Sequence, residues 1–184
     1  MKKIMFNDKF LLTKAVLDGT KIMTRRLLKE GTPLGNWEET AKCLPYKVGD
    51  IVAIAQPYKD IIECMAEYSD IIINVDGSIN REYKAGWTNK MFVKAYLLPH
   101  HIRITDVRIE RLQDITEEDC LKEGVWQSCY DKNLFYVSKN IGYASDVAFL
   151  SAREAFWYLI DKICGKGTLE RNPWVAVYTF TRVD

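Results

Sequence analysis

Gly19-Thr20-Lys21-Ile22-Met23-Thr24-Arg25-Arg26-Leu27-Leu28 is the stretch from which the fold can be worked out, because it closes one predicted element and starts the next. Glycine readily adopts the left-handed conformation that ends helices. Upstream, Asp8 is a good N-cap for a helix that runs to about Asp18. The β-branched residues after Gly19 favour a strand. We therefore predict a helix over about 8–18 and a strand within 20–28.

Further strands are predicted after residue 50. A turn at 46–50 leads into a short apolar strand at 51–55, which Pro57 ends. Residues 101–112 alternate between apolar and polar, and the alternation slips at Thr105-Asp106, which predicts a β-bulge. A hairpin is predicted over 70–83 around Asp76-Gly77, and a last strand over 174–183.

Two more helices complete the predicted elements. Thr116 caps a short helix that Gly124 closes, and Ser145 is the expected cap of a longer amphipathic helix that ends at Gly165. The strands are too short and too irregularly linked for a parallel βαβ series. The pattern predicts an α+β fold, a small mixed β-barrel with helices across its openings.

Composition narrows the class of protein. The chain has 184 residues, of which 48% are hydrophobic and 28% charged, with a net charge of +1. These values are typical of a globular chain, and the length suits a single domain spanning residues 1–184. A net charge so close to zero excludes nucleic-acid binding through overall basicity.

The charge is unevenly distributed along the chain. Residues 1–30 carry eight Lys or Arg and three acids, a local balance of +5, so the other 154 residues carry −4. The segment is either a solvated charged helix edge or an element that faces an anion.

No cofactor, metal or membrane span is expected. The five cysteines are an odd number without a Cys-x-x-Cys pair, and the two histidines are adjacent. These features favour free thiols in a reducing cytoplasm over disulfides or a zinc site. No apolar run is long enough to cross a membrane, and the apolar start of the chain is too short for a signal sequence.

Candidate catalytic residues are few, since dinucleotide-binding, phosphate-loop and nucleophile-elbow motifs are missing from the sequence. Most acids at 114–119 suit the first turn of a helix, but Glu123 lies in the last turn, where its charge opposes the helix dipole. Lys21 could serve as a base for the Thr24 hydroxyl. The alternative is that Lys21 is a surface lysine after a helix end, and spacing alone favours that alternative.

The ordered set of motifs resembles the ASCH domain family of the PUA-like superfamily. Residues 19–26 resemble its Gly-x-Lys-x-x-Thr-x-Arg signature, and the similarity continues through 46–50, 104–115, 118–119, 123–125 and 172–175. The order and spacing are most similar to phage and prophage ASCH proteins. This resemblance implies a PUA-like barrel with flanking helices, a cleft beside the N-terminal helix, and two insertions at about 57–90 and 127–144.

The resemblance also implies functions. ASCH domains are generally proposed to bind RNA or nucleotide-like ligands, and small bacterial relatives hydrolyse N4-acylated cytidines with a Lys base, a Thr nucleophile and a Glu acid. By position these residues correspond to Lys21, Thr24 and Glu123. One departure matters: Ala55-Gln56 stands where phage-type relatives carry Arg-Glu, which puts both activity and ligand in question.

Three hypotheses follow. The first, which the sequence favours narrowly, is a cytoplasmic RNA- or nucleotide-binding module without a cofactor. Its ligand would contact a set of basic and polar residues: Lys21, Arg25, Arg26, Lys29, Gln56 and Lys94. Tyr58, Trp87 or Trp126 could stack a base. The second is an amidohydrolase using Lys21, Thr24 and Glu123; the third is a phage accessory module that binds a protein.

Overall fold

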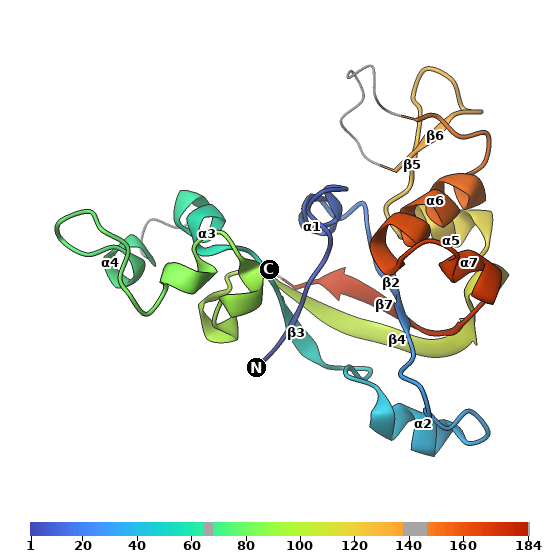
Figure 1. Cartoon of the computed structure of the whole chain (residues 1–184), viewed down its shortest axis with the longest axis horizontal. Helices are drawn as coiled ribbons and strands as arrows, with labels where there is room; N and C mark the ends of the chain where they lie inside the picture. Colours follow the sequence, from blue (N-terminus) through green and yellow to red (C-terminus); the bar gives the residue numbers. More distant parts are fainter. Residues whose placement is uncertain (65–67, 138–146, 184) are drawn as a thin grey trace. The chain divides into compact units, whose positions relative to one another are not determined.

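The computed structural model describes residues 1–64, 68–137 and 147–183 (Figure 1). The chain divides into two compact units. Unit 1 comprises Met1–Phe6, Ile51–Arg103 and the residues from Arg182 on, and unit 2 comprises Asn7–Asp50 and Ile104–Thr181. Each unit has its own apolar core. The predicted single domain over 1–184, with insertions at about 57–90 and 127–144, stays a prediction.

Unit 1 is built on three short strands. β1 (Lys2–Ile4) pairs in parallel with β3 (Ile51–Ile54), and β3 pairs antiparallel with the first residues of β4 (His101–Arg111). The other elements are helices α3 (Tyr58–Cys64) and α4 (Ser69–Ile72) and the 3-10 helices η2 (Lys84–Gly86), η3 (Lys90–Phe92) and η4 (Ala95–Leu97). Its core consists of Ala53, Tyr58, Ile61, Ile72, Tyr83, Val93, Leu97 and Leu98.

One lysine ties the first strand of unit 1 to η3. The Lys3 ammonium donates to three backbone carbonyls, those of Lys90 at 3.3 Å, Met91 at 2.7 Å and Val93 at 2.5 Å. Burial lowers the pKa of Lys3, because these neutral oxygens replace water without supplying a counter-charge.

Unit 2 places the remaining strands beside a group of helices. β7 (Trp174–Arg182) lies between the rest of β4 and β2 (Met23–Leu27), with which it pairs antiparallel. The helices are α1 (Leu12–Leu17), α2 (Trp37–Cys43), α5 (Glu117–Lys122), α6 (Ala152–Cys164), α7 (Thr168–Arg171) and the 3-10 helix η5 (Leu112–Asp114). β5 (Trp126–Gln127) and β6 (Phe135–Tyr136) form a separate two-stranded sheet.

The core of unit 2 lies where its helices meet its strands. α6 carries Ala155, Phe156 and Ile160 into a cluster with Met23 of β2 and Val175 and Val177 of β7. α5 contributes Cys120 to the same cluster and packs against both α6 and β2. The Thr116 hydroxyl caps α5 by accepting from the Asp119 amide at 3.1 Å. This packing fixes the end of α5 beside the start of β2.

The mixed α and β composition agrees with the predicted fold class, but the closed barrel is not shown. Among the described residues, the strands of neither unit close on themselves, and β1 and β2 are edge strands. The burial of β4 does change phase at Thr105-Asp106, as its sequence alternation predicts.

Two local predictions differ from the structure. The hairpin over 70–83 is replaced by α4 and a turn at Asp76-Gly77, with a single Ile73–Ile79 bridge in place of a ladder. The first helix begins at Leu12 instead of near Asp8, because Leu11 adopts a left-handed backbone and Asp8 accepts a hydrogen bond from the Thr13 hydroxyl.

The predicted cap of the long helix lies outside the described residues, since that prediction falls on Ser145. Among the described residues, α6 starts after Ser151, whose hydroxyl accepts from the Glu154 amide at 3.1 Å. Gly165 follows the end of this helix, as expected.

Candidate functional site

The start of β2 lies against the end of α5 through backbone contacts. The Ile22 amide donates to the Lys122 carbonyl at 3.0 Å, and the Lys21 amide donates to the Ala15 carbonyl at 2.9 Å. Gly124 has φ +98°, and a Cβ at this position would stand 3.2 Å from the Leu12 side chain. A glycine is therefore required for the chain to turn here, and the turn sets Glu123 opposite Lys21.

Lys21 and Glu123 form a buried ion pair. The Lys21 ammonium donates to Glu123 Oε2 at 2.6 Å and to the Glu123 carbonyl at 2.6 Å. The two side chains are only 2% and 5% exposed. Desolvation lowers the pKa of Lys21; Glu123 opposes this effect, and the charges of Arg26 and Arg25 add to it. The structure thus supplies the local reason for an acid at the end of α5: it balances a buried ammonium.

Arg25 connects Glu123 to two further carboxylates. Its Nη1 donates to Glu123 Oε1 at 3.2 Å, and its Nη2 donates to Asp119 Oδ2 at 2.9 Å. On its other side, Nε donates to Glu110 Oε1 at 2.8 Å. The Arg25 side chain is 1% exposed, so its guanidinium exchanges water for carboxylate oxygens on several sides.

Arg108 closes the network from β4. Its Nε donates to Glu110 Oε2 at 3.0 Å and its Nη2 to Asp119 Oδ2 at 2.5 Å, while its side chain is 38% exposed. The network has three cations and three anions, and we call it the charge cluster: Lys21, Arg25, Arg108, Glu110, Asp119 and Glu123.

The pKa directions follow from this arrangement. Burial works against the charge of Arg25, but Glu123, Asp119 and Glu110 outweigh it and raise the pKa of Arg25. Desolvation would raise the pKa of Asp119, yet Arg25 and Arg108 reverse that effect and hold it below the usual value. Lys21 differs from both, since desolvation prevails and lowers its pKa.

Thr24 lies within β2, where it pairs with Tyr178, and its residue is 4% exposed. Side chains alternate along a strand, so Thr24 and Arg26 project from one face and Met23 and Arg25 from the other. The 3.3 Å contact from Arg25 Nη1 to Met23 Sδ agrees with that alternation. Lys21 precedes β2, and its ammonium contacts Glu123, which also accepts from Arg25. The structure therefore brings Lys21, Glu123 and Arg25 together, while Thr24 projects from the other face of β2.

The other residues predicted to bind a ligand are spread over the two units. Arg26 is half-buried and Lys29 exposed in unit 2. Gln56 and Lys94 belong to unit 1. Gln56 is buried and its Oε1 has no hydrogen-bond partner among the described residues. Lys94 pairs with Glu82 and lies 4.8 Å above the Tyr83 ring.

Unit 2 also has an aromatic hollow of about 210 Å³, which we call the tryptophan hollow. Trp37, Tyr46 and Lys47 line it with Ala41, Leu44, Val48 and Val107. The Tyr46 ring meets the Tyr178 ring edge-on at 5.4 Å, and Trp37 is 51% exposed. Burial raises the pKa of Tyr46, and the nearby charge of Arg26 partly offsets that.

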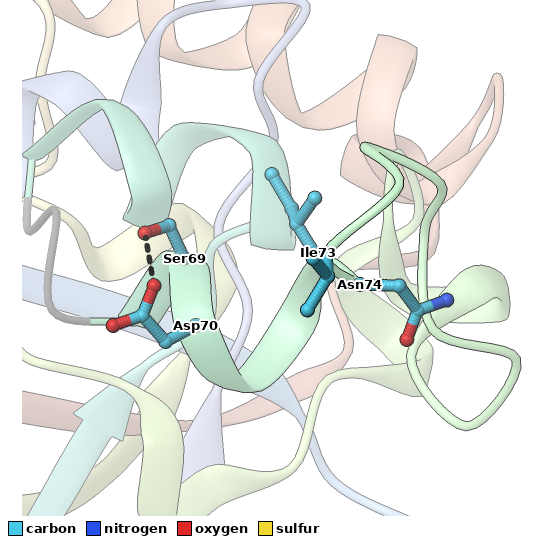
Figure 2. Close-up of a pocket in the computed structure, with 5 residues that line it drawn as sticks. Ser69, Asp70, Ile73 and Asn74 are labelled. Atoms are coloured by element: carbon cyan, nitrogen blue, oxygen red, sulfur yellow. Dashed lines mark hydrogen bonds between the residues drawn. The ribbon is translucent and has the colours of Figure 1, made fainter.

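A larger hollow of about 400 Å³ lies on unit 1 (Figure 2). The Ser69 hydroxyl donates to Asp70 Oδ1 at 3.5 Å. Figure 2 shows this contact as a dashed line, with Ile73 and Asn74 further along the chain. Val75, which completes the lining, is fully exposed. Among the described residues, those that line this hollow include no basic or aromatic side chain.

Two searches over the described residues bear on other predicted features. No group of three or more His, Cys, Asp or Glu side chains in residues 1–64, 68–137 and 147–183 could hold a metal ion. Within that same part of the chain, no helix is both long enough and apolar enough for a membrane span. The stacking role considered for Tyr58 is wrong, because its residue is 1% exposed in the core of unit 1.

Comparisons with known proteins assign no family to the chain. No protein-family model matches the chain, and no curated protein matches it. Among solved structures, the chain is similar to an ASCH domain from Lactobacillus crispatus JV V101, with 13% sequence identity and a TM-score of 0.40. The alignment covers 95% of this chain and 72% of that one. A likeness this distant carries no argument about fold or function.

Proposed function

We propose that unit 2 hydrolyses an N-acyl bond, with Lys21 and Glu123 as the proton-transfer pair and Thr24 as the nucleophile. The observation that carries this proposal is the 2.6 Å contact between the Lys21 ammonium and Glu123 Oε2 in a water-poor environment. Moving one proton from Lys21 to Glu123 produces an amine base and a carboxylic acid together. Burial lowers the pKa of Lys21, which favours release of that proton.

The charge cluster argues against phosphate binding by Lys21 and Arg25. Their carboxylate partners already neutralise them, and both side chains are nearly inaccessible to solvent. A phosphate would have to displace Glu123 or Asp119 from short, charge-assisted contacts. The sequence narrowly favours binding over catalysis, whereas the pairing of these two cations favours catalysis.

The chemistry balances over two steps. In the first, neutral Lys21 takes the Thr24 hydroxyl proton, the Thr24 oxygen bonds to the acyl carbon, the C–N bond breaks, and the amine leaves with the Glu123 proton. In the second, water attacks the acyl carbon of the Thr24 ester, the ester C–O bond breaks, one proton of the water returns to the Thr24 oxygen, and a carboxylic acid leaves. Lys21 then returns its additional proton to Glu123. The sum is an amide plus water giving an amine and an acid.

The sequence resemblance suggests the substrate class. ASCH-type hydrolases act on N4-acylated cytidines, and the Lys, Thr and Glu of their motif correspond to Lys21, Thr24 and Glu123. Ala55-Gln56, where phage-type relatives have Arg-Glu, would alter how the nucleoside is held. We therefore propose N4-acylcytidine-type nucleosides as the first substrates to try.

The direct test is to incubate the full chain with N4-acetylcytidine and to quantify cytidine and acetate. Lys21→Arg is the sharpest variant, because an arginine keeps the counter-charge of Glu123 but does not act as a base near neutral pH. We expect kcat to fall about 100-fold or more. Thr24→Val should abolish turnover, since it removes the nucleophilic oxygen while nearly preserving the side-chain volume.

Lys14→Arg is the matched control. Lys14 is an exposed lysine of α1 that pairs with Asp18, so its replacement should leave turnover at the wild-type level. Circular dichroism and urea unfolding of each variant separate loss of chemistry from loss of fold. Absence of turnover by wild-type protein at high concentration, over a series of N4-acylcytidines, would refute the proposal.

The tryptophan hollow favours a second candidate, the binding of a nucleotide or single-stranded RNA. Exposed aromatic walls beside cations are a common way to stack a base near its phosphate. Trp37 and Tyr46 would hold the base, and Arg26, Lys29 and Lys47 lie on the same unit as possible phosphate contacts. The volume of about 210 Å³ is enough for one base.

Fluorescence anisotropy with labelled single-stranded RNA tests this candidate. Trp37→Ala should weaken binding by about 1–3 kcal/mol, and affinity should fall as salt rises. Tyr130→Ala, which removes a 95% exposed aromatic ring of unit 2 that does not line the hollow, is the control. Binding that is insensitive to both salt and Trp37→Ala would count against the hollow.

A further inference from the structure

We infer that Arg25 is a positioning residue that fixes the orientation and protonation of the Lys21–Glu123 pair. The inference rests on the proposed hydrolysis for its catalytic meaning. It concerns a residue that the Lys, Thr and Glu assignment does not use, and a position that the Gly-x-Lys-x-x-Thr-x-Arg signature leaves variable.

The geometry gives each oxygen of Glu123 a different partner. Oε2 accepts from Lys21 at 2.6 Å, and Oε1 accepts from Arg25 Nη1 at 3.2 Å. A carboxylate held at one oxygen can rotate about its terminal torsion, whereas one held at both cannot. Arg25 therefore keeps Oε2, the oxygen that must exchange a proton with Lys21, facing the ammonium.

Arg25 is itself held by groups outside the pair. Glu110 of β4 accepts from Nε at 2.8 Å, and Asp119 of α5 accepts from Nη2 at 2.9 Å. Because the guanidinium is planar, these two bonds and the one to Glu123 define its plane. A lysine at this position would carry the same charge but could not present three donors in that fixed arrangement.

The charge of Arg25 also acts on proton affinity. The charged groups that face Lys21 are Glu123 from the end of α5 and Arg25 and Arg26 from β2. Glu123 has Lys21, Arg25 and the Cys120 thiol as neighbours. Arg108 of β4 contacts Glu110 and Asp119. The charge of Arg25 lowers the pKa of Lys21, so its removal should raise that pKa and move the acid limb of activity to higher pH.

Two variants separate these roles. Arg25→Lys keeps the positive charge but loses the planar guanidinium with its three fixed donors. We therefore expect kcat to fall by up to about 100-fold, while KM and the acid limb of the pH profile stay near wild type. Arg25→Gln loses the charge as well, so the acid limb and the titration of the Lys21 13Cε resonance should both move to higher pH.

Arg108→Gln is the matched control. It removes one guanidinium from the same cluster, but the contacts of Arg108 are with Asp106, Glu110 and Asp119. The Lys21 resonance should therefore move less in Arg108→Gln than in Arg25→Gln. A merely structural role for Arg25 predicts lower stability in its variants with an unchanged Lys21 titration, and that result would overturn the inference.

The Lys21 titration requires no substrate, so two failures can be told apart. Wild-type protein without turnover would refute the proposed hydrolysis, while the resonance of Lys21 would still show whether Arg25 controls its protonation. Conversely, turnover with a normal kcat in Arg25→Lys and an unmoved titration in Arg25→Gln would refute the role of Arg25 and leave the hydrolysis standing.

Discussion

Each unit contains a lysine paired with a glutamate, and the two pairs have opposite physical character. In unit 1, Lys94 and Glu82 are 31% and 59% exposed, and the Glu82 hydrogen bond raises the pKa of Lys94. In unit 2, Lys21 and Glu123 are 2% and 5% exposed, and desolvation lowers the pKa of Lys21. Burial, not the identity of the partner, decides the direction of the pKa shift.

The difference in burial bears on which of the two lysines can give up its proton near neutral pH. An exposed ammonium whose pKa is raised stays protonated at neutral pH, so Lys94 can donate a contact but cannot accept a proton. A buried ammonium next to a carboxylate can lose its proton to that neighbour without any exchange with solvent. A buried pair also costs desolvation energy, and Arg25, Asp119 and Glu110 supply further contacts that offset this cost.

The largest difference between the pairs should appear in stability. Lys21→Met leaves the Glu123 carboxylate buried with Arg25 as its one cationic partner among the described residues, so the free energy of unfolding should fall by about 3 kcal/mol. Lys94→Met removes a solvent-screened contact and should change stability little. Urea unfolding followed by circular dichroism measures both variants.

A double variant checks the cause of that loss. Adding Glu123→Gln to Lys21→Met removes the uncompensated charge, so part of the lost stability should return. Equal losses in Lys21→Met and Lys94→Met, or no recovery in the double variant, would mean that burial does not distinguish the two pairs.

The sequence predicts the elements that carry the Lys21–Glu123 pair because their signals are local. Gly19 and Gly124 do adopt positive φ, Thr116 does cap α5, and the alternation of β4 does slip at Thr105-Asp106. The charge of Glu123 in a last helical turn is unfavourable by itself, and that misfit singled Glu123 out as a candidate catalytic residue. The partner is Lys21, at a separation of 102 residues.

The rest of the charge cluster could not be predicted, because it depends on strand pairing. Arg25 meets Glu110 and Asp119 only after β2 and β4 have come together around β7, and nothing in a local window specifies that register. Two weak signals were present: Arg108 and Glu110 share one strand face, and Asp119 and Glu123 share one helix face. They show which side chains lie together, but not what lies opposite them.

The hairpin prediction failed for a related reason. Asp76-Gly77 does turn, with Gly77 at positive φ, but the preceding residues 69–72 form a helical turn that buries Ile72 in the core of unit 1. An apolar run of this length fits either a strand or a helix, and packing against Tyr58 and Ile61 selects the helix.

A smaller effect should appear in the reactivity of Cys120, which packs in the core of unit 2 beside the charge cluster. Burial, with a contribution from Glu117, raises the pKa of this thiol to about 12. Cys43, Cys129 and Cys164 are exposed, so a thiol reagent at pH 8 should label them first and Cys120 only when unit 2 opens.

Lys21→Met should speed the labelling of Cys120 about tenfold, which corresponds to about 1.4 kcal/mol less free energy for local opening. Lys94→Met should leave the rate unchanged, since its contact lies at the surface of unit 1. Peptide mass spectrometry of quenched samples identifies the labelled cysteine. A Cys120 rate unaffected by Lys21→Met would show that the pair does not hold α5 in place.

The smallest effect is the pH dependence of stability, where the two lysines should have opposite signs. The pKa of Lys21 is lower in the folded protein than the ordinary value of 10.5, so the unfolded chain binds more protons between those two pKa values. The contribution of Lys21 to stability should therefore increase as pH rises through that window. The pKa of Lys94 is raised, so its contribution to stability is complete below pH 10.5 and is lost as pH rises through the folded pKa.

The free energy of unfolding, measured at several alkaline pH values for wild type, Lys21→Gln and Lys94→Gln, gives the contribution of each lysine by difference. The wild-type minus Lys21→Gln difference should rise with pH and the wild-type minus Lys94→Gln difference should fall, and two slopes of the same sign would contradict the contrast between a buried and an exposed pair.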